Sequence, residues 1–208
     1  MLQPKATVCC GRNSEPETTH NLTMRTSLIG RLLALALTSM LLSSAYGQNT
    51  APKPSLEHKK MEVMVGTWSY EGSLESSPFW PAGNYKGKVI ARMVLGGLFL
   101  ESRWEDKSDS GNLFQAIDMQ TYDASTKTYI GHGFENDGKS SQYSRSVNGN
   151  TWTTSGTRTD RKGLLYKTRS VWTYAADGKS ATGMGEYSAD DGRTWLPLWK
   201  ETHKRVKR

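Results

Sequence analysis

The change of hydrophobic period at Gly66 is the feature that most constrains the fold of this chain. Ahead of Gly66, residues 55–65 repeat apolar side chains at helical spacing, with Ser55 in the position of a helix N-cap. Beyond Gly66, segments alternate apolar and polar side chains with a period of two, which is typical of strands that bury one face. The sequence therefore predicts one short helix followed by an all-β domain.

Turn sequences divide the region after Gly66 into about ten strands and leave no room for a helix between them. The turns are Gly96-Gly97, Asn136-Asp137-Gly138, Asn148-Gly149-Asn150, Asp177-Gly178 and Asp191-Gly192. The strands between them open at Trp68 and include residues 85–94, 98–104, 113–122, 128–134, 152–158, 164–174, 181–188 and 195–206. Because parallel pairs need long crossovers, this sheet must be antiparallel, and closing it into an up-and-down barrel removes its unpaired edges. A sandwich of two sheets is the alternative.

Residues 24–47 have the features of a secretory signal peptide. Arg25 and Arg31 supply positive charge, residues 32–42 form an apolar run, and Ala45-Tyr46-Gly47 predicts cleavage before Gln48. The apolar run is shorter than the roughly 20 residues that span a bilayer, although an uncleaved anchor is the alternative. We expect a bacterial protein that is periplasmic or secreted, with no stable membrane insertion after cleavage.

The expected organisation has four parts. Residues 1–23 are interpreted as an upstream extension from a misassigned start, which leaves Met1 and Met24 as alternative start sites, and residues 24–47 are the signal peptide. Residues 48–54 form a linker, and residues 55–208 form the barrel domain. The chain has two cysteines, Cys9 and Cys10, so the predicted domain has neither a disulfide framework nor a thiolate metal site.

Several stretches together resemble a bacterial secreted family, domain of unknown function 1579. They are residues 58–68, residues 94–100, Thr121-Tyr122-Asp123 followed by Lys127-Thr128-Tyr129, and the closing Glu201. The helix before Gly66 and Trp68 is also similar to the opening of lipocalin-like (calycin) proteins. The resemblance covers residues 54–206 and implies a calycin-like barrel but no reaction and no catalytic residues. The chain departs from the family pattern at its last strand. The family usually has Tyr-x-Arg there, whereas residues 201–205 of this chain read Glu-Thr-His-Lys-Arg.

The histidines of the domain are His58, His132 and His203, and they are far apart in the sequence. We expect them on the helix surface, between glycines on a strand, and in an exposed basic tail, so no metal site and no cofactor is predicted. Haem binding is an alternative, because some lipocalin-like haem proteins ligate iron through a histidine near the end of the last strand, where His203 lies.

No enzyme signature stands out in the sequence. Glu105, Asp106, Asp109 and the pair Asp190-Asp191 fall in stretches that resemble turns, where carboxylates are usually solvated. The sequence contains neither a Gly-x-Ser-x-Gly elbow nor a phosphate-binding loop. The net charge of +7 comes from scattered basic residues, and we expect no nucleic-acid partner. A cavity that holds a histidine with a carboxylate in hydrogen-bond reach would revive an enzymatic function.

The seven tryptophans give the clearest indication of function, because most would point into the barrel. A barrel of this size can hold one small ligand, and an apolar loop at residues 78–81 would lie at its mouth as a lid or contact patch. The expected ligand-binding residues are Trp68, Phe79, Trp80, Trp104 and Trp172. The first hypothesis is an exported binding module for a small apolar or amphipathic ligand. The alternatives are a filled-core structural or interaction protein of the cell envelope and, last, an enzyme. The oligomeric state stays open.

Overall fold

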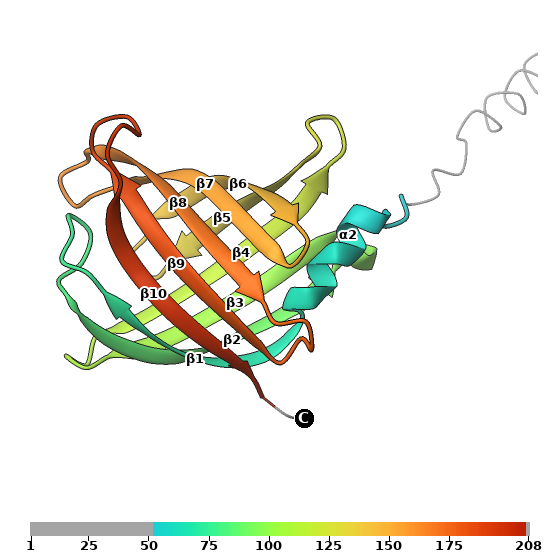
Figure 1. Cartoon of the computed structure of the whole chain (residues 1–208), viewed down its shortest axis with the longest axis horizontal. Coiled ribbons are helices and arrows are strands. Elements are labelled where there is room, and N and C mark those ends of the chain that lie inside the picture. The colour runs from blue at the N-terminus through green and yellow to red at the C-terminus, as the bar shows by residue number, and fades with distance from the viewer. Residues whose placement is uncertain (1–51, 207–208) are drawn as a thin grey trace, which may run out of the picture. The chain divides into compact units, whose positions relative to one another are not determined.

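A computed structural model describes residues 52–206, which form a closed barrel of ten antiparallel strands (Figure 1). Each strand pairs with its neighbours in sequence, and β1 pairs with β10 to close the sheet. This confirms the predicted all-β barrel with its short N-terminal helix and rejects the two-sheet sandwich. The predicted upstream extension, the signal peptide and residues 48–51 of the linker lie outside the described residues.

The strand bounds follow the predicted turns closely. The strands are β1 (Gly66–Leu74), β2 (Gly83–Val94), β3 (Phe99–Ser108), β4 (Leu113–Asp123), β5 (Thr128–Glu135), β6 (Ser140–Asn148), β7 (Thr151–Thr159), β8 (Leu165–Tyr174), β9 (Ser180–Ser188) and β10 (Leu196–Arg205). A 3-10 turn, η2 (Leu95–Gly97), joins β2 to β3 at the predicted glycine pair.

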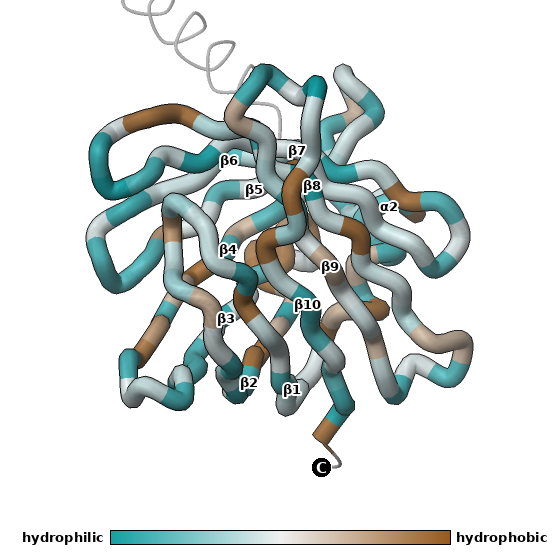
Figure 2. Tube along the Cα trace, turned by 60° about the vertical axis from the view of Figure 1, so that its left-hand side comes forward, coloured by the Kyte–Doolittle hydropathy of each residue, from teal (hydrophilic) through white to brown (hydrophobic). Residues whose placement is uncertain are grey.

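Burial alternates along the strands as the sequence pattern predicts. In β2, Val89 and Ala91 point into the barrel with 4% and 5% of their surface exposed, whereas Ile90 between them points outward and is 45% exposed. Figure 2 shows hydrophobic segments interspersed with hydrophilic ones along the strands. The interior of the barrel is therefore the core of the protein.

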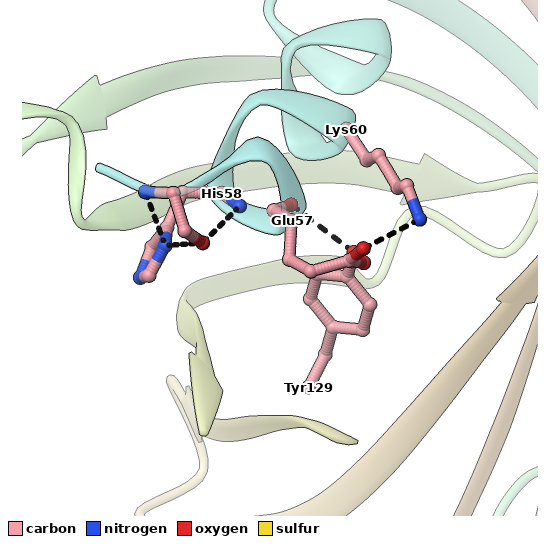
Figure 3. Close-up of polar contacts among 5 residues, drawn as sticks. Glu57, His58, Lys60 and Tyr129 are labelled. Atoms are coloured by element: carbon pink, nitrogen blue, oxygen red, sulfur yellow. Dashed lines mark hydrogen bonds and ion pairs between the residues drawn. The ribbon is translucent and has the colours of Figure 1, made fainter. Parts of the chain in front are cut away.

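The helix α2 (Leu56–Lys60) and the 3-10 helix η1 (Met61–Met64) close one end of the barrel, here called the helix end. Ser55 is the N-cap as predicted: its hydroxyl accepts a hydrogen bond from the His58 amide, and the His58 side chain accepts one from the Ser55 amide (Figure 3). The Tyr129 hydroxyl donates to the carboxylate of Glu57 over 2.7 Å, which ties the helix to β5.

Arg205 fastens the helix end to the last strand. Its guanidinium lies 4.1 Å from the ring of Trp68 and donates hydrogen bonds to the backbone carbonyls of Val63, Val65 and Gly178. A guanidinium suits this position because it can stack on an indole while its N–H groups satisfy carbonyls that the short helix leaves unpaired. One side chain thus links β1, β10, η1 and the β8–β9 turn.

The connection between β1 and β2 closes the opposite end, here called the loop end (Figure 1). Phe79 is 6% exposed and packs against Tyr187 and Leu198, and the guanidinium of Arg158 lies 4.3 Å from the Trp80 ring. This loop lies at the barrel mouth as predicted, and Phe79 is buried against β9 and β10.

Glycines on the inner face of β9 make space for two large rings. A methyl group at Gly183 would lie 2.7 Å from the Trp172 ring, and one at Gly185 would overlap the indole of Trp199. Only glycine allows these rings to lie across the neighbouring strand, so the two residues help to set the shape of the interior.

Candidate functional site

The barrel interior holds a cavity of about 40 Å³. Indole rings form much of its wall, from Trp68, Trp104, Trp152 and Trp172, and three ionisable side chains, Asp118, Arg145 and His203, also face it. The remaining lining residues are Met64, Val89, Ala91, Ser102 and Tyr174. The cavity is therefore aromatic but carries charged groups, which is the usual composition of a small-ligand site.

His203 lies inside the barrel, with 5% of its surface exposed. Its ring stacks on Tyr70 at a centroid distance of 4.8 Å and meets the edge of Trp172 at 4.6 Å. The prediction of an exposed histidine in a wet basic tail was wrong, because β10 continues to Arg205 and its alternation turns His203 inward.

A buried carboxylate holds the His203 imidazole. Nε2 of His203 lies 2.8 Å from Oε2 of Glu201, and the Tyr85 hydroxyl donates to the same carboxylate over 2.6 Å. Burial, together with the negative charge of Glu201, raises the pKa of the Tyr85 hydroxyl and keeps it a donor. This leaves Nδ1 of His203 without a hydrogen-bond partner among the described residues.

A second inward carboxylate, Asp106, accepts a hydrogen bond of 2.9 Å from the Tyr70 hydroxyl. Burial raises the pKa of Asp106 to about 6, while the Tyr70 bond opposes the rise. The prediction that Glu105 and Asp106 lie in a turn was wrong, because both belong to β3, where Asp106 faces inward. Tyr70 thus links Asp106 to the stacked His203 ring.

Arg145 on β6 approaches the cavity from a different part of the wall. Its Nε donates to the Thr154 hydroxyl and its Nη1 to the Gln120 side chain, both over 2.8 Å. Nearby, the Tyr143 hydroxyl donates to Asp118 over 2.5 Å, and burial raises the pKa of Asp118. Neutral partners fix the guanidinium in place, and its Nη2 has no hydrogen-bond partner among residues 52–206.

The structure brings three of the predicted site residues together and separates the other two. Trp68, Trp104 and Trp172 line the cavity, whereas Phe79 and Trp80 belong to the cluster at the loop end. Asp118 and Arg145 were not among the predicted site residues, and His203 was considered only as a haem ligand. Strict alternation in β6 and β10 was the available signal, since it places Arg145 in register with Tyr143 and His203 in register with Glu201.

The cavity does not fit haem. Its volume of about 40 Å³ holds a group of a few atoms and not a rigid macrocycle. Aromatic rings cover His203 on several sides, and its Nε2 is held by Glu201. His58 and His132 lie away from His203, on the helix and on the outer face of β5. Within residues 52–206, no group of three His, Cys, Asp or Glu side chains is arranged to hold a metal ion.

In the same part of the chain, no helix is both long and apolar enough to cross a membrane.

These features define a lipocalin-like barrel with an enclosed aromatic cavity. The chain belongs to the family described as Protein of unknown function (DUF1579), whose model matches residues 53–205. The predicted membership is therefore confirmed. No curated protein matches the sequence significantly.

Two solved structures share the fold at low sequence identity. Rv2717c from M. tuberculosis is 11% identical with a TM-score of 0.52, and the match covers 74% of this chain and 99% of that one. The S-type phycobiliprotein lyase CPES from Guillardia theta is 13% identical with a TM-score of 0.51, and the match covers 74% of this chain and 94% of that one. Both similarities concern the fold alone.

Proposed function

We propose that this protein binds one small amphipathic ligand inside its barrel. The observation that carries the proposal is the interior cavity, where four indole rings meet the side chains of Asp118, Arg145 and His203. A core that served stability alone would be expected to avoid such charges, because burying them costs free energy. The same barrel architecture occurs in two solved proteins, one of which is a phycobiliprotein lyase.

We expect the ligand to reach the cavity from the loop end of the barrel. The inward residues of β6 to β8 remain partly accessible, among them Tyr143, Thr168 and Ser170. A cavity of about 40 Å³ accommodates only a group of a few atoms, since one water needs on the order of 10–15 Å³. The rest of a ligand would extend toward the loop end and require the Phe79 loop to move.

Native mass spectrometry of the exported protein tests the proposal. Beside the denatured mass, we expect one bound small molecule per chain. Ser102→Leu, which adds side-chain volume at the cavity wall, should remove the adduct, whereas Gln142→Leu on the outer face of β6 should retain it. A bare chain, with no response to added amphipathic compounds in a thermal-shift assay, would favour a filled-core interaction protein instead.

We also infer that the protein is exported to the periplasm or beyond the cell, on the strength of the signal-peptide features in residues 24–47. The mass of the mature chain tests this inference, because cleavage before Gln48 predicts a chain that begins at that residue. A product that retains residues 24–47 would favour the uncleaved anchor.

Acid–base catalysis is a second candidate function, favoured by one specific observation. His203 faces the cavity and its Nε2 lies 2.8 Å from the Glu201 carboxylate, which is how a carboxylate orients a general base. Ester hydrolysis with small p-nitrophenyl esters tests it: His203→Gln should abolish turnover, and Gln142→Leu on the outer face of β6 should retain it. Equal rates for the wild type and His203→Gln would reject catalysis by this pair.

A further inference from the structure

Arg145 carries a permanent positive charge inside the barrel and forms no direct ion pair with a carboxylate among residues 52–206. An arginine side chain stays protonated at all physiological pH values. Its Nε and Nη1 atoms donate to neutral groups, Thr154 and Gln120, and no ion pair joins Arg145 to a carboxylate within residues 52–206. Asp118 is close enough for its charge and that of Arg145 to affect each other, and the guanidinium lies 4.8 Å from the Tyr143 ring, but no carboxylate accepts a hydrogen bond from it. Buried charges in proteins are usually paired directly, so this guanidinium still has room for an anionic partner.

One nitrogen of the guanidinium remains available at a residue that lines the cavity. Among the described residues, every fully buried side-chain nitrogen or oxygen has a hydrogen-bond partner. Nη2 of Arg145 has none, so it must keep accessible surface, and Arg145 lines the cavity. A donor with a full positive charge is therefore presented to a space large enough for a few atoms.

The surroundings of Arg145 tolerate an anion. Asp118, which faces the same cavity, already accepts the Tyr143 hydroxyl at 2.5 Å. Burial raises the pKa of Asp118, although the charge of Arg145 and the Tyr143 hydrogen bond oppose the rise, and the net effect favours its uncharged form and reduces its repulsion of a negative group. Glu201 faces His203 and Tyr85 and is occupied by both.

We propose that the ligand of this barrel is an organic monocarboxylate, whose carboxylate occupies the cavity against Arg145 and whose apolar body extends from the cavity toward the loop end. The inference rests on the proposed ligand-binding function and adds the chemical class of the ligand. A carboxylate is planar and accepts hydrogen bonds from a guanidinium more strongly than a neutral carbonyl does. The indole rings of Trp68, Trp104 and Trp172, which line the same cavity, supply apolar contact for the carbon atoms next to the carboxylate.

Calorimetric titration with acid and amide pairs of equal shape tests this assignment on the full exported chain. The probes are octanoate with octanamide, benzoate with benzamide, and inorganic phosphate. Because a charged hydrogen bond contributes about 1.5–3 kcal/mol, we expect each acid to bind at least about tenfold more tightly than its amide. The octanoate and benzoate arms separate an alkyl body from an aromatic one, and phosphate should bind more weakly than either acid.

Variants of Arg145 test whether this residue causes the preference for acids over amides. Arg145→Met should erase the preference for acids while leaving amide binding unchanged, and Arg145→Lys should retain part of the preference because it keeps the charge. Arg161→Met, in the exposed β7–β8 turn, is the matched control and should bind as the wild type does. Arg145→Met should fold at least as stably as the wild type, because it removes a buried charge that forms no direct ion pair. If it does not fold, the acid and amide comparison in the wild type and in Arg145→Lys still decides.

The outcomes separate this inference from the function on which it rests. Amides that bind as tightly as acids, or an acid preference that survives in Arg145→Met, would overturn the carboxylate assignment and leave ligand binding intact. Phosphate binding stronger than that of both acids would overturn the organic acid in favour of an inorganic anion. A protein that binds none of the probes and carries no adduct would overturn both proposals.

Discussion

Met61 and Leu100, at the helix end of the barrel, have no exposed surface. Trp104 and Tyr143, which lie farther from the helix along β3 and β6, face the interior and remain partly accessible. The helix end is fastened through the backbone, since Arg205 bonds to carbonyls of three segments. The loop end is covered by the side chains of a single connection, mainly Phe79 and Trp80. This difference indicates that one end stabilises the barrel while the other can open.

The helix end and the barrel interior also differ in how their charges are compensated. Arg205 donates hydrogen bonds to backbone carbonyls and stacks its guanidinium on the Trp68 ring, so its charge is compensated within the protein. Arg145, which lines the cavity, leaves one nitrogen without a hydrogen-bond partner among the described residues. The same residue type therefore has a structural use at the helix end and, in our proposal, a binding use in the interior.

Arg205→Met should have the largest effect on stability. It leaves the carbonyls of Val63, Val65 and Gly178 without their donor and removes the cation from the Trp68 ring. We expect the free energy of unfolding in urea to fall by about 3–4 kcal/mol. Lys204→Met, on the exposed side of the same strand, should change it by less than about 0.5 kcal/mol. Equal effects of the two variants would mean that the helix end is not fastened by Arg205.

Phe79→Ala should have a smaller and more local effect. Removing a buried phenyl ring usually costs about 3–5 kcal/mol, but a loop can collapse into the space, and we expect about 2 kcal/mol. Hydrogen exchange should accelerate at the amides of Glu75 and Ser77, which bond to Leu198 and Trp80, more than at the helix end. Leu165→Ala, 68% exposed at the same end, is the control. Uniform acceleration throughout the barrel would contradict an independently opening loop end.

The fold was predictable because its signals are local. Alternation and turn residues placed the strands to within a few residues: β1 begins at Gly66, ahead of the predicted Trp68, and β3 continues to Ser108, past the predicted Trp104. The buried positions of Trp68, Trp152 and Trp172 followed from the same alternation. Each of these features depends on neighbouring residues, so a single sequence contains enough information to predict it.

The candidate site was only partly predictable because it depends on contacts across the barrel. Arg145, Asp118 and His203 come from β6, β4 and β10, and no local pattern shows that these strands face one cavity. His203 also lies beside Lys204 and Arg205, and this basic composition favoured an exposed tail. Closure of the barrel reverses that expectation, because it turns every second residue of β10 inward.

Asp106→Asn should have the smallest effect, and its pH dependence tests how easily charge is accommodated toward the loop end. Asp106 titrates near pH 4 in an unfolded chain and near pH 6 in the barrel, because burial raises its pKa to about 6. The folded protein therefore binds more protons between these values, and its free energy of unfolding falls as the pH rises through them. Asparagine keeps an acceptor for the Tyr70 hydroxyl without the charge.

We expect Asp106→Asn to be more stable than the wild type by on the order of 1–2 kcal/mol at pH 8, a figure reduced for the partial exposure of Asp106, and equal to it at pH 3.5. Urea unfolding at both pH values measures the difference, with Asp109→Asn in the exposed β3–β4 turn as control. A gain that is constant with pH would show that the carboxylate of Asp106 is already solvated, and the interior would then be wet as far as Tyr70. A gain confined to high pH would place the boundary between dry core and accessible interior at Asp106.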